Sequence, residues 1–351
     1  MWGNSAIKGT KIPKSDYLYQ PMRPLSILFL AAFTLQACSV SKNTTTAKIW
    51  DQAPHNAFTD LIRFKGAFYC AFREAQGHVS GADGKARILR SKDGKTWESI
   101  ALLEVKDRDI RDPKLSVTPQ NRIMVLMDIE AHEGKKVISR KPLISLSNEK
   151  GDAFSTPEES TVDPSIASWS DWVWRLTWFN GTGYAILYQQ EKIYLVSTKD
   201  GHYFQHVSQL AIDGRPNECA IRFDDNGKMY VVIRREAGDQ MGVVATAAAP
   251  YKEWNFSKMD YRIGGPDFLF LNQQTLAIGT RQYIPKVSTV IYVTGLDGKV
   301  RKTIPLPSGG DTSYPGMLIW KGQLWASYYS SHEGKASIYL AKIPLPLLSS
   351  K

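Results

Sequence analysis

The segment 215–236 carries side chains that can bind an anion and accept a proton. Two strand-like runs flank the turn signal Asp-Asp-Asn-Gly at 224–227, a pattern that predicts one antiparallel hairpin. The residue before the first strand and the residue after the second lie at the same end of a hairpin. We therefore expect Glu218 beside Arg234 and Arg235, either as a plain surface ion pair or as part of a pocket.

Three short turns of similar composition recur along the chain, at 91–97, 147–154 and 198–204. Each joins a small hydroxyl residue, an acid and a glycine to an aromatic residue, and Trp254 ends a degenerate fourth copy. The aromatic positions give a repeat of about 50 to 57 residues. We expect the polar side chains to bind the local backbone while the aromatic ring packs inward, so these turns are predicted to be structural.

Between these turns, a unit of strand, polar or glycine turn, and strand returns six times. The hairpins are predicted at 61–73, 115–128, 176–189, 219–234, 268–281 and 317–329. Six units of four short strands, without a convincing amphipathic helix, predict an all-β fold, a six-bladed β-propeller. The run 47–50 can complete the last blade and close the ring. A β-sandwich is the alternative fold, but it does not explain the even spacing.

Blades that share one orientation bring the open ends of all six hairpins to one face, around the axis. The predicted pairs are Asp60 with Arg73 and Glu74, Asp112 with Asp128, Arg175 with Gln189 and Gln190, Glu218 with Arg234, Asp267 with Arg281, and Tyr314 with Tyr328. Polar residues are common at strand ends, so any single pair can be an ordinary feature. Six pairs together predict a shared pocket.

The ordered set of Glu218, Arg234, Arg281 and Tyr314 resembles the exo-α-sialidase (neuraminidase) superfamily, over about residues 50 to 343. The short turns are similar to its Asp-box repeats, which also occur in propellers without this activity. Glu218 with Arg234 is similar to the acid and arginine of its fourth blade, and Arg281 to its fifth-blade arginine. The segment 311–314 (Asp-Thr-Ser-Tyr) resembles the approach to its nucleophilic tyrosine.

The resemblance implies that Tyr314 is a nucleophile and that Glu218 is the base that activates it. A sialic acid carries a carboxylate on its anomeric carbon, so a neutral tyrosine avoids the repulsion that an anionic nucleophile meets. Tyrosine has an unperturbed pKa of about 10 and needs a base beside it; sialidases are exceptions to the two-carboxylate rule for glycosidases. Arg234 and Arg281 would bind the substrate carboxylate through their guanidinium forks.

Blade one departs from the family pattern, because the segment 55–60 lacks the third arginine that the family has there. We predict that Arg73, at the other end of the same hairpin, supplies this group. By their positions at hairpin ends, Arg175, Asp267 and Tyr328 are further candidates for substrate binding.

The proton donor is open between several residues. The family's acid/base aspartate lies in the loop after the first hairpin, where this chain has Asp83 and also His78. Asp60 and Asp112, each of which opens a hairpin, are rival donors by position. A role as local turn caps is the alternative for both.

The amino-acid composition limits the classes of molecule that the protein is expected to bind. The 351 residues carry a formal charge of +10, which favours acidic partners, yet no Lys/Arg-rich run marks a nucleic-acid surface. Aromatic residues make up 11% of the chain, which suits an all-β protein with a stacking surface. The chain has no HExxH, paired CxxC, GxGxxG before a helix or Walker loop, so we expect no metal or other cofactor. An acidic glycan fits these features best.

The N-terminal region has the pattern of a targeting segment. A short basic stretch and an apolar run precede Leu-Gln-Ala-Cys, which resembles a bacterial lipobox with Cys38 as the lipidated residue. A buried strand that happens to end in cysteine is the alternative. The predicted division is an upstream extension at 1–21, a signal peptide at 22–37, a tether at 38–46 and the propeller at 47–345. Cys70 and Cys219 are predicted to be buried free thiols, with a disulfide as the alternative.

We therefore expect a protein of the bacterial cell envelope that is anchored to a membrane through Cys38. It would act as an exo-glycosidase that removes terminal acidic sugars, either sialic acid or a related keto-acid sugar. One alternative is a glycan-binding propeller without catalysis. Another is a glycosidase with a carboxylate pair, Asp60 or Asp112 with Glu218, acting on a neutral sugar. Fold alone does not choose among these functions.

Overall fold

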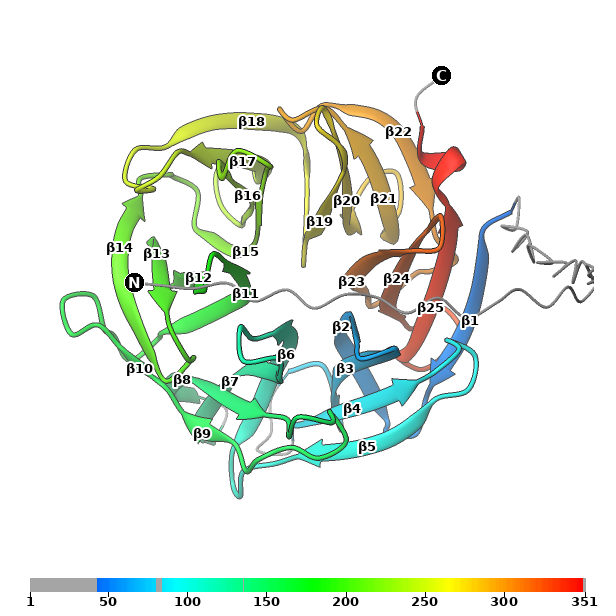
Figure 1. Cartoon of the computed structure of the whole chain (residues 1–351), viewed down its shortest axis with the longest axis horizontal. Coiled ribbons are helices and arrows are strands. Elements are labelled where there is room, and N and C mark those ends of the chain that lie inside the picture. The colour runs from blue at the N-terminus through cyan, green and yellow to red at the C-terminus, as the bar shows by residue number, and fades with distance from the viewer. Residues whose placement is uncertain (1–42, 80–83, 135, 350–351) are drawn as a thin grey trace, which may run out of the picture. The chain divides into compact units, whose positions relative to one another are not determined.

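The computed structural model describes residues 43–79, 84–134 and 136–349, which form six β-sheets around one axis (Figure 1). The prediction of a six-bladed β-propeller is confirmed. Blade one consists of β2 (His55–Phe64), β3 (Ala67–Ala75), β4 (Lys85–Ser91) and β5 (Glu98–Leu103). Blade two consists of β6 (Asp109–Val117), β7 (Ile123–Glu133), β8 (Lys136–Leu146) and β9 (Glu158–Glu159). Blade three consists of β11 (Trp172–Phe179), β12 (Thr182–Tyr188), β13 (Ile193–Thr198) and β14 (Tyr203–Leu210), with β10 (Thr161–Val162) beside β14.

The last three blades complete the ring. Blade four consists of β15 (Pro216–Phe223), β16 (Met229–Arg235), β17 (Met241–Ala247) and β18 (Asn255–Arg262). Blade five consists of β19 (Asp267–Asn272), β20 (Thr275–Gln282), β21 (Ser288–Thr294) and β22 (Val300–Pro305). Blade six consists of β23 (Thr312–Trp320), β24 (Gln323–Ser330) and β25 (Ser337–Pro344) with β1 (Thr45–Trp50). A short 3-10 helix, Leu345–Leu348, follows β25. The first strand of each blade, from β2 to β23, packs beside the first strand of the next blade.

The ring closes through its N-terminal strand, as the sequence predicted. β1 pairs antiparallel with β25, so Lys48 lies opposite Tyr339, and the two strands lie side by side in Figure 1. The indole nitrogen of Trp50 then donates a hydrogen bond to Glu74 in blade one, at 2.6 Å. The last blade is thus built from both ends of the propeller chain.

Six hydrophobic clusters fill the spaces between the blades, and five of them contain residues of two neighbouring blades only. The sixth cluster lies between blades six and one and also includes Trp172 and Trp174 of blade three. Strand periodicity explains this arrangement, because successive side chains point to opposite faces of a sheet. In β16, Val231 packs against blade three while Val232 packs against blade five. Cys70 and Cys219 are buried free thiols inside these clusters, as predicted.

The recurring short turns bind their own backbone. In the first turn, the amide of Gly94 donates to Ser91 Oγ at 2.8 Å, and the amides of Lys95 and Thr96 donate to Asp93 Oδ1. These bonds hold the pKa of Asp93 at about 2. The third turn repeats the bond from a glycine amide, here to Thr198 Oγ1 at 2.8 Å. The predicted structural role of these turns therefore agrees with their contacts.

Five of the innermost strands carry a β-bulge close to their N-terminal ends. Four of these bulges hold a residue other than glycine at positive φ: Phe58 at 63°, Asp112 at 46°, Arg175 at 39° and Tyr314 at 53°. Such a conformation costs about 1–3 kcal/mol per residue and is typical of functional sites. A bulge turns a side chain out of the regular alternation of a strand, so these four residues break the pattern that period two predicts.

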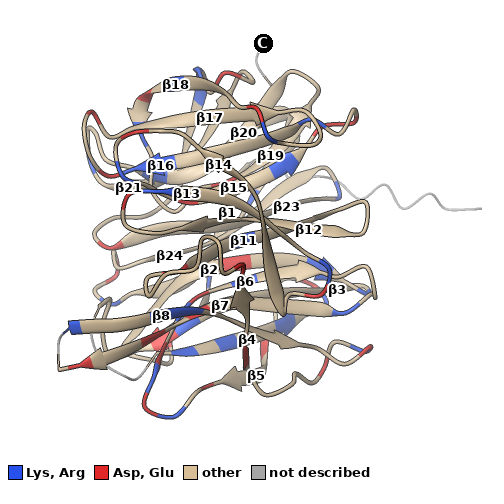
Figure 2. Cartoon of the chain, turned by 90° about the vertical axis from the view of Figure 1, so that its left-hand side faces the viewer, with Lys and Arg blue, Asp and Glu red and all other residues tan. Residues whose placement is uncertain are grey.

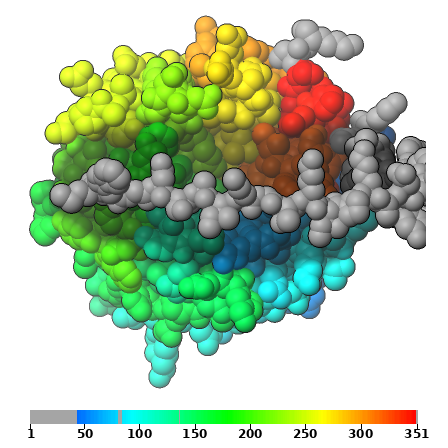
Figure 3. Space-filling view, in the orientation of Figure 1, coloured from blue at the N-terminus to red at the C-terminus, as the bar shows by residue number. Residues whose placement is uncertain are grey.

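The surface of the blades recedes toward the axis on the face seen in Figure 3. On the side seen in Figure 2, basic and acidic segments are interspersed rather than separated by sign. Among the described residues, no helix is long and apolar enough to span a membrane. The predicted signal peptide, Cys38 and most of the tether lie outside the described residues.

Candidate functional site

Tyr314, Glu218 and Arg234 meet at the N-terminal ends of the inner strands. Tyr314 donates its phenolic hydrogen bond to Glu218 Oε1 at 2.6 Å, although the two residues belong to blades six and four. Nη1 of Arg234 lies 2.6 Å from the same oxygen and 3.3 Å from the Tyr314 hydroxyl. The amide of Gly265 occupies Glu218 Oε2 at 2.8 Å. Glu218 thus accepts three hydrogen bonds as a carboxylate.

These contacts set the protonation of the pair. Burial pushes the pKa of Glu218 upward, but the charge of Arg234 and the hydrogen bonds from Tyr314 and Arg234 bring that pKa below its usual value. Burial, followed by the charge of Glu218, holds the pKa of Tyr314 well above its usual value. The resting pair is therefore a neutral phenol and an ionised carboxylate, aligned for transfer of the phenolic proton to Glu218.

Arg234 and Arg281 flank this pair and differ in the groups that they contact. Arg234 is held between two acids, because its Nη2 contacts Glu236 while Nη1 contacts Glu218. Arg281 donates through Nε to the carbonyl of Thr312 at 2.9 Å and through Nη2 to the Tyr329 hydroxyl at 3.0 Å. Its guanidinium lies 5.5 Å from the centre of the Tyr314 ring. The structure therefore brings together Glu218, Arg234, Arg281 and Tyr314, as the sequence predicted.

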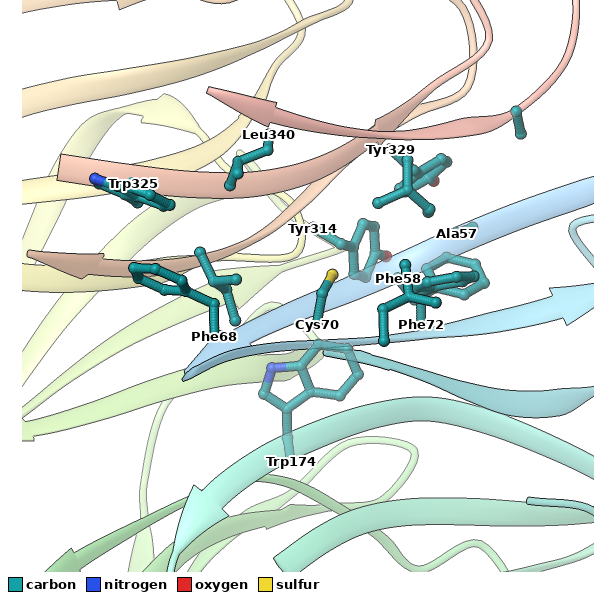
Figure 4. Packing of buried hydrophobic residues seen from close by; sticks show 14 of the residues in the cluster. Ala57, Phe58, Phe68, Cys70, Phe72, Trp174, Tyr314, Trp325, Tyr329 and Leu340 are labelled. Atoms are coloured by element: carbon teal, nitrogen blue, oxygen red, sulfur yellow. The ribbon is translucent and has the colours of Figure 1, made fainter. Parts of the chain in front are cut away.

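Aromatic rings enclose Tyr314 (Figure 4). Phe58 meets it edge to face at a centroid distance of 5.0 Å, and Trp174 does so at 6.0 Å. Tyr329 lies 6.0 Å away on the side of blade six. Only 6% of Tyr314 is exposed. This wall excludes water from the phenol and strengthens its bond with Glu218.

Asp112 is a buried carboxyl group close enough to interact with Glu218. Its Oδ1 has no hydrogen-bond partner among the described residues. Burial raises the pKa of Asp112, the charges of Lys114 and Arg111 lower it, and the charge of Glu218 raises it further. The net shift is upward, which favours the protonated form that a proton donor needs. Of the described candidates for this role, Asp112 has the environment that suits it.

Lys114 belongs to the charged segment 111–114, whose sequence fits a pocket edge and a solvated loop equally, so no role was predicted for this lysine. Its Nζ lies 4.9 Å from the ring centre of Trp174 and donates to the carbonyls of Phe58 and Thr59. Burial, followed by the charge of Arg175, lowers the pKa of Lys114 to about 8. This residue adds a positive charge beneath the phenol.

Asp60 and Asp267 link blades and do not fit the roles predicted for them. Asp60 Oδ2 accepts the amide of Leu115 in blade two at 2.8 Å, and its Oδ1 accepts the amide of Leu61. Asp267 likewise accepts the amide of Met317 in blade six at 3.0 Å. Both carboxylate oxygens of Asp60 are taken up by these amides and by Arg175, so the contacts of Asp60 do not fit the role of proton donor to a substrate.

Arg175 is also bound within the protein. Its Nη1 contacts Asp60 Oδ1 at 2.8 Å and Asp267 Oδ2 at 3.6 Å, while its Nη2 donates to the carbonyl of Pro315. The three residues line an axial cavity of about 240 Å³, whose lining does not include Tyr314. The predictions that Arg175 and Asp267 bind substrate are therefore not supported by their contacts.

Arg73 is bound within the protein, and Tyr328 lies on the face of β24 opposite to Tyr329. The guanidinium of Arg73 is fully buried in an ion pair with Asp109 at 2.7 Å, and it also donates to the carbonyls of Gly77 and Ile110. Tyr328 faces the opposite side of β24, stacks on Tyr339 and donates to the carbonyl of Pro307. The predicted compensation by Arg73 is therefore not supported. Period two places the adjacent Tyr329 in the site instead.

The edge of the site holds two histidines and an aspartate. His55 opens β2, His78 follows β3, and Asp311 precedes β23. Both imidazoles lie within 3 Å of Asp311 Oδ2, while Tyr329 donates to Asp311 Oδ1 at 2.7 Å. Asp83, the other candidate of the same loop, lies outside the described residues. His78 was a candidate from the sequence, but the cluster itself leaves no local sequence pattern, because its members come from blades one and six.

No protein-family model matches this sequence, and no curated protein is similar to it in sequence. The structure is similar to that of a protein of unknown function from Dyadobacter fermentans, with a TM-score of 0.75, 16% identity, and coverage of 87% of this chain and 100% of that one.

Solved sialidases share the fold at lower identity. NanB sialidase from Streptococcus pneumoniae has a TM-score of 0.67 and 9% identity over 85% of this chain and 70% of its own. Trypanosoma rangeli sialidase in complex with sialic acid has a TM-score of 0.62 and 9% identity over 86% of this chain and 59% of its own. At these identities, the similarity establishes a sialidase-like propeller fold alone.

Proposed function

We propose that this protein is an exo-acting glycoside hydrolase that removes terminal acidic sugars, sialic acid or a related keto-acid sugar, from glycans. The observation that carries the proposal is the 2.6 Å hydrogen bond from the Tyr314 hydroxyl to Glu218 Oε1. A tyrosine at positive φ, buried and bound to a carboxylate, is a costly arrangement for a structural residue.

In the first step, Tyr314 Oη forms a bond to the anomeric carbon while its proton moves to Glu218 Oε1. The bond from that carbon to the leaving oxygen breaks through an oxocarbenium-like transition state. Asp112 donates a proton to the leaving oxygen, and Asp83 is the alternative donor. In the second step, water gives one proton to the donor carboxylate and attacks the same carbon, and Tyr314 leaves with the proton held on Glu218.

The charges around the phenol support the choice of an acidic sugar. Arg281 uses Nε and Nη2 within the protein, so Nη1 is the group that we expect to meet the substrate carboxylate. Arg234 adds its charge from the far side of Glu218. The site already holds the anion of Glu218, and the substrate would bring its own carboxylate. A neutral phenol can approach the anomeric carbon without adding a third negative charge.

Hydrolysis of a fluorogenic sialoside and of a panel of acidic glycosides tests the proposal. The full chain with Cys38→Ser should release sugar from at least one of them. Tyr314→Phe should abolish this release, and Glu218→Gln should lower kcat/KM by about 10²–10⁴-fold. Tyr328→Phe is the matched control, because it removes a hydroxyl that binds Pro307 outside the site, and it should retain activity.

The other outcomes decide between the remaining functions. Tight binding of an acidic glycan without turnover would overturn the hydrolase and favour a glycan-binding propeller. Turnover that survives Tyr314→Phe would favour a carboxylate pair, in which Asp112 and Glu218 are the buried acids that interact. Turnover confined to neutral sugars would remove the assigned role of Arg281.

We also propose that the protein is anchored in the bacterial cell envelope by lipid on Cys38. The support is the sequence pattern that precedes this residue. An anchored exo-glycosidase would act on glycans near the membrane that carries it.

A further inference from the structure

The cluster of His55, His78 and Asp311 has the composition of a metal site. Nε2 of His55 lies 2.9 Å from Asp311 Oδ2, and Nδ1 of His78 lies 2.7 Å from the same atom. The three ligand atoms all lie within 4.8 Å of one another. Two imidazoles and a carboxylate suit zinc and its neighbours in the first transition row.

We propose that His55, His78 and Asp311 bind a divalent transition-metal ion, with zinc as the best fit, at the edge of the Tyr314 pocket. Tetrahedral zinc with bonds of about 2.0–2.1 Å places its ligand atoms about 3.3 Å apart. The two separations from Asp311 Oδ2 would therefore widen by about half an ångström. The two imidazole nitrogens, which lie within 4.8 Å of each other, would settle at the same ligand spacing. Three protein ligands leave a fourth position for water or an anionic group.

The surroundings of the cluster orient its ligands. The Tyr329 hydroxyl donates to Asp311 Oδ1 at 2.7 Å and leaves Oδ2 to the two histidines. Such a partner behind a ligand carboxylate is typical of metal sites. His55 presents its Nε2 to the cluster. The side chains of His78 and Asp311 are 40% and 30% exposed, which gives an ion a path from solvent.

A second group of similar residues shows what a compensated cluster looks like. Asp109, Glu130 and His132 also lie close together. Arg73 and Arg111 contact Asp109, and Arg140 contacts Glu130 at 2.8 Å, so protein cations already neutralise these acids.

Among the described residues, the protein cation that contacts Asp311 besides the histidines is Arg281, at 3.6 Å from Oδ1. Arg281 is also bound to Tyr329 and Thr312. The oxygen that faces the histidines is thus the one that Arg281 does not contact.

The position of the cluster links it to the pocket. The ring of Phe58 contacts His78 at a centroid distance of 5.1 Å and Tyr314 at 5.0 Å. An ion held here lies one aromatic ring away from the phenol, beside Arg281. It adds positive charge to the side of the pocket where an acidic ligand would bind. This role rests on the proposed function, whereas the metal site does not.

Zinc binding by the full chain with Cys38→Ser, free of affinity tags and treated with chelator, tests the site without any sugar. Competition with a fluorescent chelator and elemental analysis should give about one equivalent of zinc with a Kd in the micromolar range or below. Cobalt in place of zinc should give a visible absorption band of a four-coordinate site. His78→Ala and Asp311→Asn should each weaken binding about 100-fold or more, since each removes a ligand.

His202→Ala is the matched control, because this exposed histidine lies near Glu158 in another blade, and it should leave zinc binding unchanged. His78 is partly exposed, so its replacement is expected to leave the fold intact, which circular dichroism checks. A protein that takes up no stoichiometric zinc at about 100 µM overturns the site. Zinc binding that is unchanged in both His78→Ala and Asp311→Asn overturns it as well. Because zinc binding is read without substrate, a failure of hydrolysis leaves this result intact.

Discussion

Replacing Asp112 with asparagine should make the protein more stable and lower the proposed hydrolase activity. Asp112 is 6% exposed, and its Oδ1 has no partner among the described residues. Burial and the nearby Glu218 raise its pKa in the folded protein, whereas the unfolded chain has a pKa of about 3.9. Each unit between these two values costs the folded state about 1.36 kcal/mol at a pH above both.

The sign follows from proton binding. Between the unfolded and the folded pKa, the folded protein holds a proton that the unfolded chain has lost, so stability falls as pH rises through this window. The amide introduced by Asp112→Asn does not titrate, and the gain in stability of this variant should therefore grow from near zero at about pH 4 to a plateau. For a propeller of this size, about 1 kcal/mol corresponds to about 2 °C in Tm.

The catalytic loss should depend on the leaving group. A sugar alcohol needs a proton to leave, so Asp112→Asn should lower kcat/KM on natural glycosides by about 10²–10⁴-fold. An activated aryl group leaves without a proton and should show little loss. Urea unfolding at several pH values and kinetics with paired substrates measure both effects.

Asp128→Asn is the control for this prediction. Burial also raises the pKa of Asp128 well above its usual value, but its Oδ1 accepts the amide of Val173 between blades. Its replacement should show the same sign of pH dependence without the leaving-group effect. If Asp112→Asn is less stable than wild type at pH 8, Asp112 is a stabilised anion, and the reasoning fails. An equal loss on both substrates would make Asp112 a binding group and refute its role as proton donor.

Three further predictions concern other parts of the chain. Burial lowers the pKa of Lys114 to about 8 in the folded protein, whereas the unfolded value is about 10.4, so the free energy of unfolding should rise with pH between about pH 8 and pH 10. Urea unfolding of Lys114→Met should show a smaller rise over this range. An unchanged dependence of the unfolding free energy on pH would contradict the prediction. Ser91→Ala removes the acceptor of the Gly94 amide and should cost about 1–2 kcal/mol of unfolding free energy, whereas Lys92→Ala should cost little; equal effects would refute a structural role for the turn. Cys38→Ser should move the protein from the membrane fraction to the soluble fraction of the bacterium, and a variant that stays in the membrane would argue against the lipid anchor.

Much of the fold follows from local patterns in the sequence. The Asp-Asp-Asn-Gly turn at 224–227 fixes a hairpin, and register then places Glu218 beside Arg234. The even spacing of similar turns predicts six blades, because each blade repeats the same local chemistry. The meeting of Tyr314 with Glu218 came instead from a family resemblance, because these residues lie 96 positions apart.

The predictions that failed did so for distinct physical reasons. Position at a hairpin end does not fix the direction of a side chain when a bulge interrupts the strand. Asp60 follows such a bulge and binds the backbone of blade two, and Arg175 lies in one and binds Asp60. Tyr328 failed through the simple alternation of β24, by one residue. Contacts between blades, such as those of Asp311 with His55 and His78, leave no trace in local sequence.

The repeated bulge separates geometry from chemistry in this propeller. Phe58, Asp112, Arg175 and Tyr314 share one local backbone shape, yet their side chains are an apolar ring, an acid, a cation and a phenol. The blades thus have equivalent backbone positions around the axis, and each position carries a different functional group. Substituting the side chain at one of these positions, for example Phe58→Arg to add a cation, can change the class of ligand. The blades that carry the other three side chains would keep their structure.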